Sequence, residues 1–197
     1  DNGRLYQRYL GKKLNHESDF VYLPQGTEVY ITHGAEDYFE PAIQVLHNDG
    51  NPSLLLKYVE HSSSRQNDGS VETVITLKDD KYPVTVKLHY ITYAAENIIK
   101  TFTEINHQEK KPIVLSKYAS SMLHFNRDKY FLTEFSGDWA HEVNIAEREL
   151  AFGKKTIDTK LGARANMFVS PFFQLSLGAP SEENSGEVLV GTYLWSG

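Results

Sequence analysis

The sequence predicts an all-β protein, a large antiparallel β-sandwich. Apolar and polar residues alternate over residues 71–78 and 84–90, which is the period of a strand with one buried face and one face in water. Asn-Asp-Gly triplets at 48–50 and 67–69 stand between apolar runs, and these residue types tolerate the positive φ of tight hairpins. No long stretch shows a convincing 3.6-residue apolar stripe, so helices are not expected to dominate.

Four further stretches complete the predicted set of strands: residues 54–61, 97–106, 112–125 and 129–135. Turn formers lie at 79–80, 126–128 and 180–184, and short strands separated by such turns are typical of a sandwich. Residues 141–152 are ambiguous, because the spacing of their apolar side chains suits a short helix as well as a strand.

The length of 197 residues allows one large β domain or two small ones. A chain of this size buries roughly 70% of its unfolded surface, enough for a substantial core. The most loop-like stretch, residues 62–67, is too short for a linker. We therefore predict a single domain over residues 1–197.

The composition excludes several kinds of partner. The net charge is −6, and basic residues cluster only as pairs, so nucleic acid and anionic membranes are not expected partners. Cysteine is absent, which excludes disulfides and cysteine-ligated metals. No apolar run approaches the ~20 residues of a membrane span. Asp1 is not an initiator Met, so a removed leader is compatible with the sequence, and the compartment stays open between the cytoplasm and the periplasm or exterior of a bacterium.

The last third of the chain carries the most specific motifs. Phe-Ser-Gly-Asp-Trp-Ala-His-Glu at 135–142 is followed by Pro-Phe at 171–172, Ser-Gly-Glu-Val-Leu-Val-Gly at 185–191 and Leu-Trp-Ser-Gly at 194–197. In this order and spacing, these segments resemble the end of the N-terminal β-sandwich domain of glycoside hydrolase family 36, the α-galactosidases or melibiases.

Three earlier segments extend the resemblance over nearly the whole chain. They are Tyr-Leu-Gly-Lys-Lys-Leu at 9–14, Gly-Ala-Glu-Asp-Tyr-Phe-Glu-Pro-Ala at 34–42 and Leu-Lys-Tyr-Val-Glu-His at 56–61. One departure is Phe39, which stands where the family usually has Arg. The forked hydrogen bonds of a guanidinium are therefore lost at this position.

The resemblance implies a supersandwich of the galactose-mutarotase-like kind, and it favours a strand over residues 141–152. It also implies a parent enzyme that hydrolyses terminal α-galactosides with retention, using two Asp residues on a (β/α)8 barrel. The family's nucleophile lies in a Lys-Trp-Asp tripeptide, which this chain lacks. We therefore expect the catalytic pair downstream of Gly197, no catalytic residue in this chain, and no hydrolysis by the chain alone.

The resemblance also suggests site residues and partners. Asp37 and Tyr38 are candidates for substrate binding, because the family's N-terminal domain loops reach a pocket in some relatives; the alternative is that Asp37 makes only a turn. Trp139 and Trp195 are candidates for a domain interface, although Trp139 could also stack on a sugar ring. The implied partners are the enzyme's own barrel, an α-galactoside and further copies of the enzyme in a homo-oligomer. No cofactor is implied.

Two other chemistries find little support in the sequence. His33, His47 and His61 recur every 14 residues, but zinc ligands usually include closer pairs, so we expect no metal site. Ser136, Asp138 and His141 lack the pattern of a nucleophile elbow, so a hydrolytic triad is not expected.

Two alternative functions remain. The first is a free-standing carbohydrate-binding β-sandwich module. The second is an adhesin or receptor-type sandwich, against whose disulfide-bearing forms the absence of a Cys-Trp-Cys signature argues.

Overall fold

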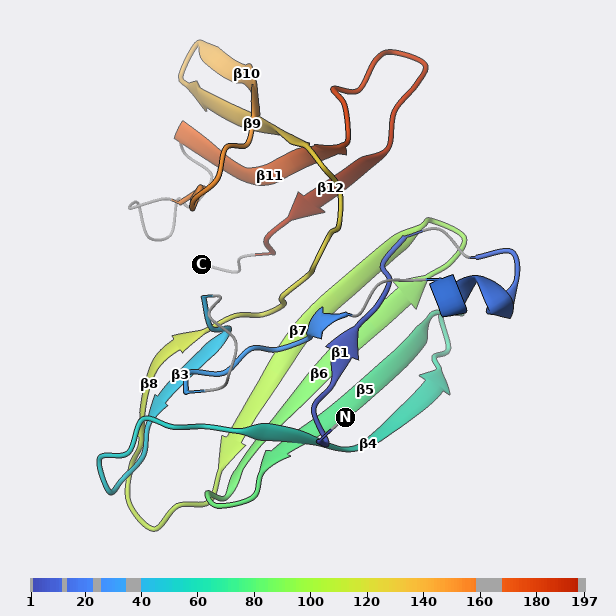
Figure 1. Ribbon diagram of the computed structural model, residues 1–197. Helices are drawn as coiled ribbons and strands as arrows, with labels where there is room; N and C mark the ends of the chain where they lie inside the picture. Colours follow the sequence, from blue (N-terminus) through green and yellow to red (C-terminus); the bar gives the residue numbers. More distant parts are fainter. Residues whose placement is uncertain (1, 12–13, 23–25, 35–39, 159–167, 195–197) are drawn as a thin grey trace. The chain divides into compact units, whose positions relative to one another are not determined.

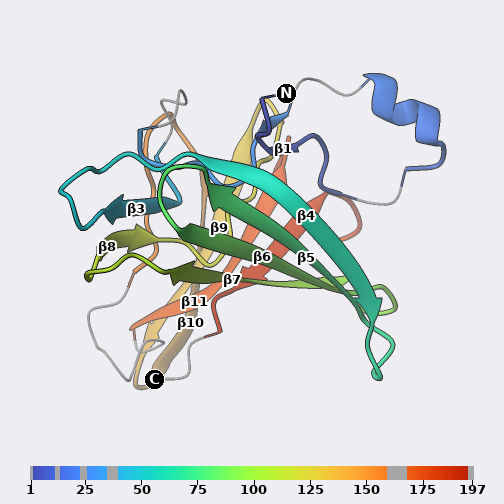
Figure 2. The same ribbon diagram turned by 90° about the horizontal axis from the view of Figure 1, so that it is seen from below.

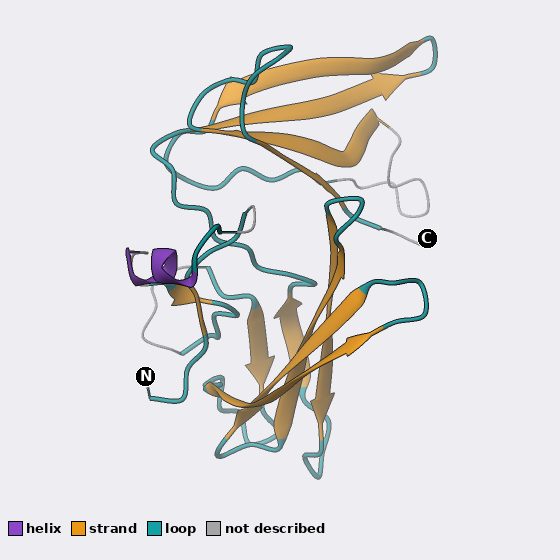
Figure 3. Ribbon diagram, turned by 90° about the vertical axis from the view of Figure 1, so that its right-hand side faces the viewer, coloured by secondary structure: helices purple, strands orange, loops and turns teal. Residues whose placement is uncertain are grey.

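A computed structural model describes residues 2–11, 14–22, 26–34, 40–158 and 168–194. Its contacts divide the chain into two compact units, Asp1–Phe125 and Asn126–Gly197, which we describe separately. Nearly all the regular structure is strand, as predicted. Within the described ranges, the one helical element is the short 3-10 helix η1 (Glu17–Tyr22; Figure 3). No helix in these ranges is long and apolar enough to cross a membrane.

The first unit is built on a four-stranded antiparallel sheet in the order β4-β5-β6-β7. Its strands are β4 (Leu56–Arg65), β5 (Val71–Asp79), β6 (Val84–Tyr93) and β7 (Ile98–His107), which lie side by side in Figure 2. Consecutive strands pair through hairpins, and the turn before β5 places Gly69 at φ 86°. The strands predicted in this region are therefore confirmed. The expectation of a loop over 62–67 is wrong for its first four residues, because β4 continues to Arg65 in register with β5.

Two short strand pairs lie against this sheet. β1 (Tyr6–Gln7) pairs with β2 (Thr27–Glu28), and β3 (Ile43–Leu46) pairs with β8 (Val114–Tyr118), both antiparallel (Figure 1). The strand predicted over 112–125 is thus shorter than expected. The residues that follow β8 are held by side-chain hydrogen bonds instead of backbone pairing with a strand. The Tyr30 hydroxyl donates to Ala119 O at 2.7 Å, and the Thr103 hydroxyl donates to Ser120 O at 3.0 Å.

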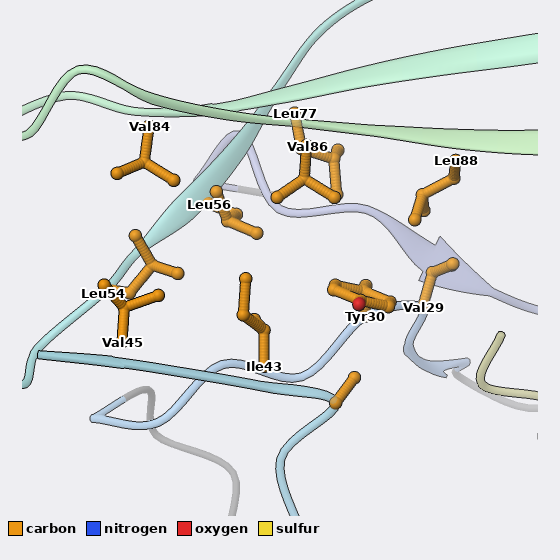
Figure 4. Close-up of a cluster of buried hydrophobic side chains, with 11 residues drawn as sticks. Val29, Tyr30, Ile43, Val45, Leu54, Leu56, Leu77, Val84, Val86 and Leu88 are labelled. Atoms are coloured by element: carbon orange, nitrogen blue, oxygen red, sulfur yellow. The ribbon is translucent and has the colours of Figure 1, made fainter. Parts of the chain in front are cut away.

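The core of the first unit lies between these layers. The alternation read from 84–90 places Val84, Val86 and Leu88 on the inner face, where each is at most 3% exposed. Across the core they face side chains contributed by the opposite layer, including Tyr30, Ile43 and Val45 (Figure 4). The sheet is therefore a sandwich layer, as predicted.

One side chain on the outer face of this sheet departs from the expected pattern. The alternation predicts that His89 faces water, yet it is only 9% exposed. Its ring stacks on Phe102 with centroids 4.2 Å apart, and its Nδ1 lies 2.9 Å from Glu72 Oε1. A cross-strand aromatic partner and a carboxylate cover this side chain, which strand periodicity alone cannot reveal.

The second unit is a four-stranded antiparallel sheet in the order β10-β9-β11-β12. Its strands are β9 (Tyr130–Asp138), β10 (His141–Glu149), β11 (Phe168–Leu177) and β12 (Val188–Thr192). The ambiguous residues 141–152 therefore form a strand as far as Glu149, as the family resemblance suggested. Together the two units give an all-β architecture of antiparallel sheets, which confirms the predicted fold class.

Replacement of Ile43 tests whether the first unit depends on this core. Ile43 is fully buried, so Ile43→Ala should lower the free energy of unfolding by about 3 kcal/mol through lost burial and a residual cavity. Ile99 on β7 is 51% exposed, so the matched Ile99→Ala change should cost less than about 1 kcal/mol. Urea unfolding followed by circular dichroism measures both, and equal losses would contradict this assignment of the core.

Candidate functional site

Of the four candidate site residues proposed from the sequence, the structure describes Trp139. Asp37, Tyr38 and Trp195 lie outside the described residues. Trp139 is described and lies at the turn between β9 and β10, where it is 88% exposed. Its assignment to a domain interface stays a prediction, but it does not belong to the core of its own unit.

The residues that flank 35–39 are fixed to the core of the first unit. His33 N–H donates to Ile43 O at 3.2 Å, and His33 O accepts from Leu54 N–H at 3.2 Å. Gly34 has φ +90°, and a Cβ at this position would lie 3.2 Å from both Cα and Oγ of Ser53. Glycine therefore meets two requirements here, a left-handed backbone and a close approach to the neighbouring chain.

The residues that follow 35–39 are held by β3 and β8. Glu40 forms an ion pair with Lys117 of β8, and Ala42 N–H donates to Ile31 O at 2.7 Å. Ala42 is 1% exposed and leads directly into β3. The described backbone on both sides of 35–39 is thus anchored to the first unit.

A buried ion pair supports Ser53, the neighbour of Gly34. His47 Nε2 donates to Ser53 O at 3.0 Å, and His47 Nδ1 lies 2.6 Å from Glu109 Oε1. The two side chains are 0% and 2% exposed, and the ring of Tyr82 stacks on His47 at 3.5 Å. Both ring nitrogens of His47 therefore lie within hydrogen-bond distance of an acceptor.

The surroundings of this ion pair favour the charged carboxylate. Burial raises the pKa of the Glu109 carboxyl, but hydrogen bonds from His47 and from Asn48 N–H, together with the charge of His47, outweigh that effect. The net result is a pKa below the ordinary value of 4.5. The pKa of Asp49 in the adjoining turn is also lowered, by hydrogen bonds from Asn51 N–H and from the Tyr82 hydroxyl.

A shallow hollow of about 280 Å³ lies beside this anchored backbone. Its lining combines polar and apolar side chains: His33, Gln44, Val45, Leu46, Pro52, Val114 and Ser116. The Ser116 hydroxyl donates to Gln44 O at 3.3 Å, where the pairing of β3 and β8 is irregular. Such a lining suits contact with an uncharged ligand or a protein surface, and the described residues that form it include no carboxylate for acid–base catalysis.

The three histidines considered as metal ligands have different surroundings. His47 belongs to the buried ion pair, His61 Nδ1 lies 2.7 Å from the Tyr58 hydroxyl, and His33 lines the hollow. Across the described ranges, no group of three or more His, Asp or Glu side chains could hold a metal ion. Asp138 Oδ1, considered for a triad, accepts a hydrogen bond from Trp139 N–H at 2.7 Å.

Sequence reasoning missed the role of Glu109. This residue is 62 positions from His47, and nothing in the local pattern around either residue indicates the pair. The only local feature that could have indicated this pair is a histidine beside a turn, and many surface loops contain such a histidine. The contact arises because the chain that leaves β7 returns to the Asn48–Pro52 turn, which only the tertiary structure shows.

Comparison with known proteins assigns the family. The family model described as "Glycosyl hydrolase family 36 N-terminal domain" matches residues 3–197. The chain belongs to this family. The resemblance read from the sequence motifs is therefore confirmed, and the protein is an N-terminal domain of the kind found in family 36 α-galactosidases.

Relatives at the level of sequence and structure agree with this assignment. The chain is 21% identical to α-galactosidase Mel36A of Lactobacillus acidophilus over 182 residues, which is 85% of this chain and 25% of that protein. It also resembles the crystal structure of α-galactosidase AgaB from Geobacillus stearothermophilus, with a TM-score of 0.81 and 23% identity over 95% of this chain and 30% of that one.

A variant of α-galactosidase AgaA from the same organism, crystallised with raffinose, has a TM-score of 0.73 and 23% identity over 93% of this chain and 27% of that chain. Identities this low support the shared fold alone. The family 36 N-terminal domain thus spans only about a quarter to a third of these relatives' length.

Acid unfolding tests the His47–Glu109 pair of this family 36 domain. Because the folded-state pKa of Glu109 lies below 4.5, the unfolded chain binds this proton first as the pH falls. The stability contributed by the pair is therefore present above about pH 4.5 and is lost below it. Glu109→Gln should reduce the proton uptake that accompanies unfolding in this range.

Chemical unfolding at a series of pH values between about 3 and 7 measures this proton uptake. Glu183→Gln, in the exposed 180–184 turn, provides the control. An unchanged pH dependence in Glu109→Gln would contradict the role assigned to the pair.

Proposed function

We propose that this chain is the non-catalytic N-terminal β-sandwich domain of a retaining α-galactosidase, an enzyme that removes terminal α-galactosyl groups. The observation that carries the proposal is the family match over residues 3–197 in a chain that spans 25% of a curated α-galactosidase. The absence of a Lys-Trp-Asp tripeptide from the sequence supports a catalytic pair located elsewhere in the enzyme.

The domain's own role in this proposal is mechanical and spatial. It supports the (β/α)8 barrel and contributes to a homo-oligomer, with Trp195 at the junction with the barrel. The segment that carries Asp37 and Tyr38 borders the galactoside pocket. Anchored backbone on both sides supports this role, because a substrate contact is useful only when its supporting chain is held in place.

The first experiment compares the 197-residue chain with the full-length enzyme, using p-nitrophenyl α-galactoside as substrate. We expect turnover by the full-length enzyme and none by the chain alone, because a retaining glycosidase requires two facing carboxyl groups. Hydrolysis by the chain alone, or an inactive full-length protein, would overturn the proposal. Retention is checked by following the anomer of the released galactose by NMR.

Variants of the full-length enzyme test the substrate contact. Asp37→Ala should raise KM for raffinose about tenfold, the effect of one lost charged hydrogen bond of roughly 1.4 kcal/mol. Tyr38→Phe tests the hydroxyl separately from the ring. Steady-state kinetics provide the measurement, and Asp128→Ala, in an exposed turn of the second unit, is the control. A KM equal to that of the control would leave Asp37 with only its turn-forming role.

A further inference from the structure

The turn between β9 and β10 presents a tryptophan to solvent. We call residues 138–143 the hairpin tip. Trp139 is 88% exposed and Val143 is 66% exposed, while Ile145 on β10 and Phe168 on the neighbouring strand are 66% and 44% exposed. Two of these side chains lie in the hairpin tip and two on the strands beside it, and exposed large apolar side chains can mark an interaction surface.

Hydrogen bonds within the turn fix its backbone. Asp138 Oδ1 accepts from Trp139 N–H at 2.7 Å, and Glu142 Oε1 accepts from Ala140 N–H at 3.2 Å. The Asn144 side-chain amide donates to His141 O at 3.0 Å. These contacts hold the chain that carries Trp139, so less conformational entropy is lost when this side chain meets a partner.

The same turn contains unfavourable backbone conformations. Ala140 and Val143 have φ 60° and 58°, and a β-branched residue at positive φ is uncommon. Phe168, which pairs with Gly137, has φ 69°. Gly137 is itself crowded, because a Cβ there would lie 2.9 Å from His141 O. Strain of this kind persists where the surrounding structure enforces it, and it gathers at functional positions.

Charge restricts the kind of partner that the hairpin tip fits. Asp138 and Glu142 flank Trp139, and residues 137–145 include no Lys or Arg. Two identical acidic tips would repel each other, which disfavours a symmetric contact between copies of the tip. A central tryptophan with a polar surround is the usual composition of an interface hot spot.

We infer that the hairpin tip docks into the remaining part of the same enzyme, in an apolar pocket with a rim of Lys, Arg or neutral hydrogen-bond donors. This inference rests on the proposed function, which gives the domain a barrel to support. About three-quarters of the length of relatives such as Mel36A lies outside the region that this chain matches, so such an enzyme has ample surface to receive Trp139. The contact would fix the orientation of the second unit on the rest of the enzyme.

Hydroxyl-radical footprinting with mass spectrometry tests this contact in the 197-residue chain and in the full-length enzyme. Trp139 should be oxidised several-fold more slowly in the full-length enzyme, because the pocket covers its ring. Equal oxidation in both forms would overturn the inference. If raffinose slows the oxidation of Trp139 in the shorter chain, the inference is overturned and the ring is a sugar-binding surface. If rising concentration of the shorter chain slows this oxidation, the inference is overturned and the tip contacts another copy.

Variants provide a second, independent measurement. Trp139→Ala should lower the melting temperature of the full-length enzyme and leave that of the 197-residue chain unchanged, because the exposed ring contributes little to its own unit. Trp139→Phe should lower the melting temperature of the full-length enzyme less than Trp139→Ala does. Asp138→Asn should make that melting temperature less dependent on salt concentration. Phe152→Ala removes another fully exposed aromatic ring outside the tip and is the matched control.

A full-length melting temperature that is the same for Trp139→Ala and the control would contradict docking. The enzyme's activity on α-galactosides is scored separately, so failure of the docking inference can be distinguished from failure of the proposed function.

Discussion

The first unit depends on covering the apolar inner face of the β4–β7 sheet. Val84 and Val86 are fully buried on that face, and a single sheet cannot bury them alone. β3 supplies Ile43 and Val45 from the opposite layer. Because β3 begins soon after residues 35–39, the same packing that stabilises the core also anchors the described chain that follows this segment.

Buried polar groups supplement this apolar constraint at the edge of the core. The His47–Glu109 pair, together with Tyr82, fills the space beneath the Asn48–Pro52 turn and supports Ser53. Such a pair is costly to break, because removing one partner leaves a buried charge unsatisfied. The region beside the hollow is therefore held by specific contacts as well as by burial.

The second unit distributes its apolar residues differently. Leu132 is 6% exposed, whereas Ile145, Val190 and Trp139 on the same sheet and its hairpin are each more than half exposed. A β domain that acts alone rarely leaves so many large apolar side chains in water. The pattern agrees with a domain that works as one part of a larger enzyme.

The sequence by itself determined the class of the fold, the positions of most strands and the family. Alternation with period two is a local property, so 84–90 reveals the inner face of β6 without any tertiary information. Along 71–78 the same pattern leads to burial only at Leu77. The family motifs are also local, which is why the order of residue types along the chain is enough to indicate the family. The same motifs suggested a strand over residues 141–152, where periodicity alone was ambiguous.

The tertiary structure decided which distant residues meet. It placed Glu109 beside His47 and stacked Phe102 on His89. It also ended β8 at Tyr118, after which the next two carbonyls accept hydrogen bonds from side chains. It also showed that Trp139 projects from a constrained turn. These outcomes depend on contacts between residues far apart in the chain, and no local pattern of residue types encodes such contacts.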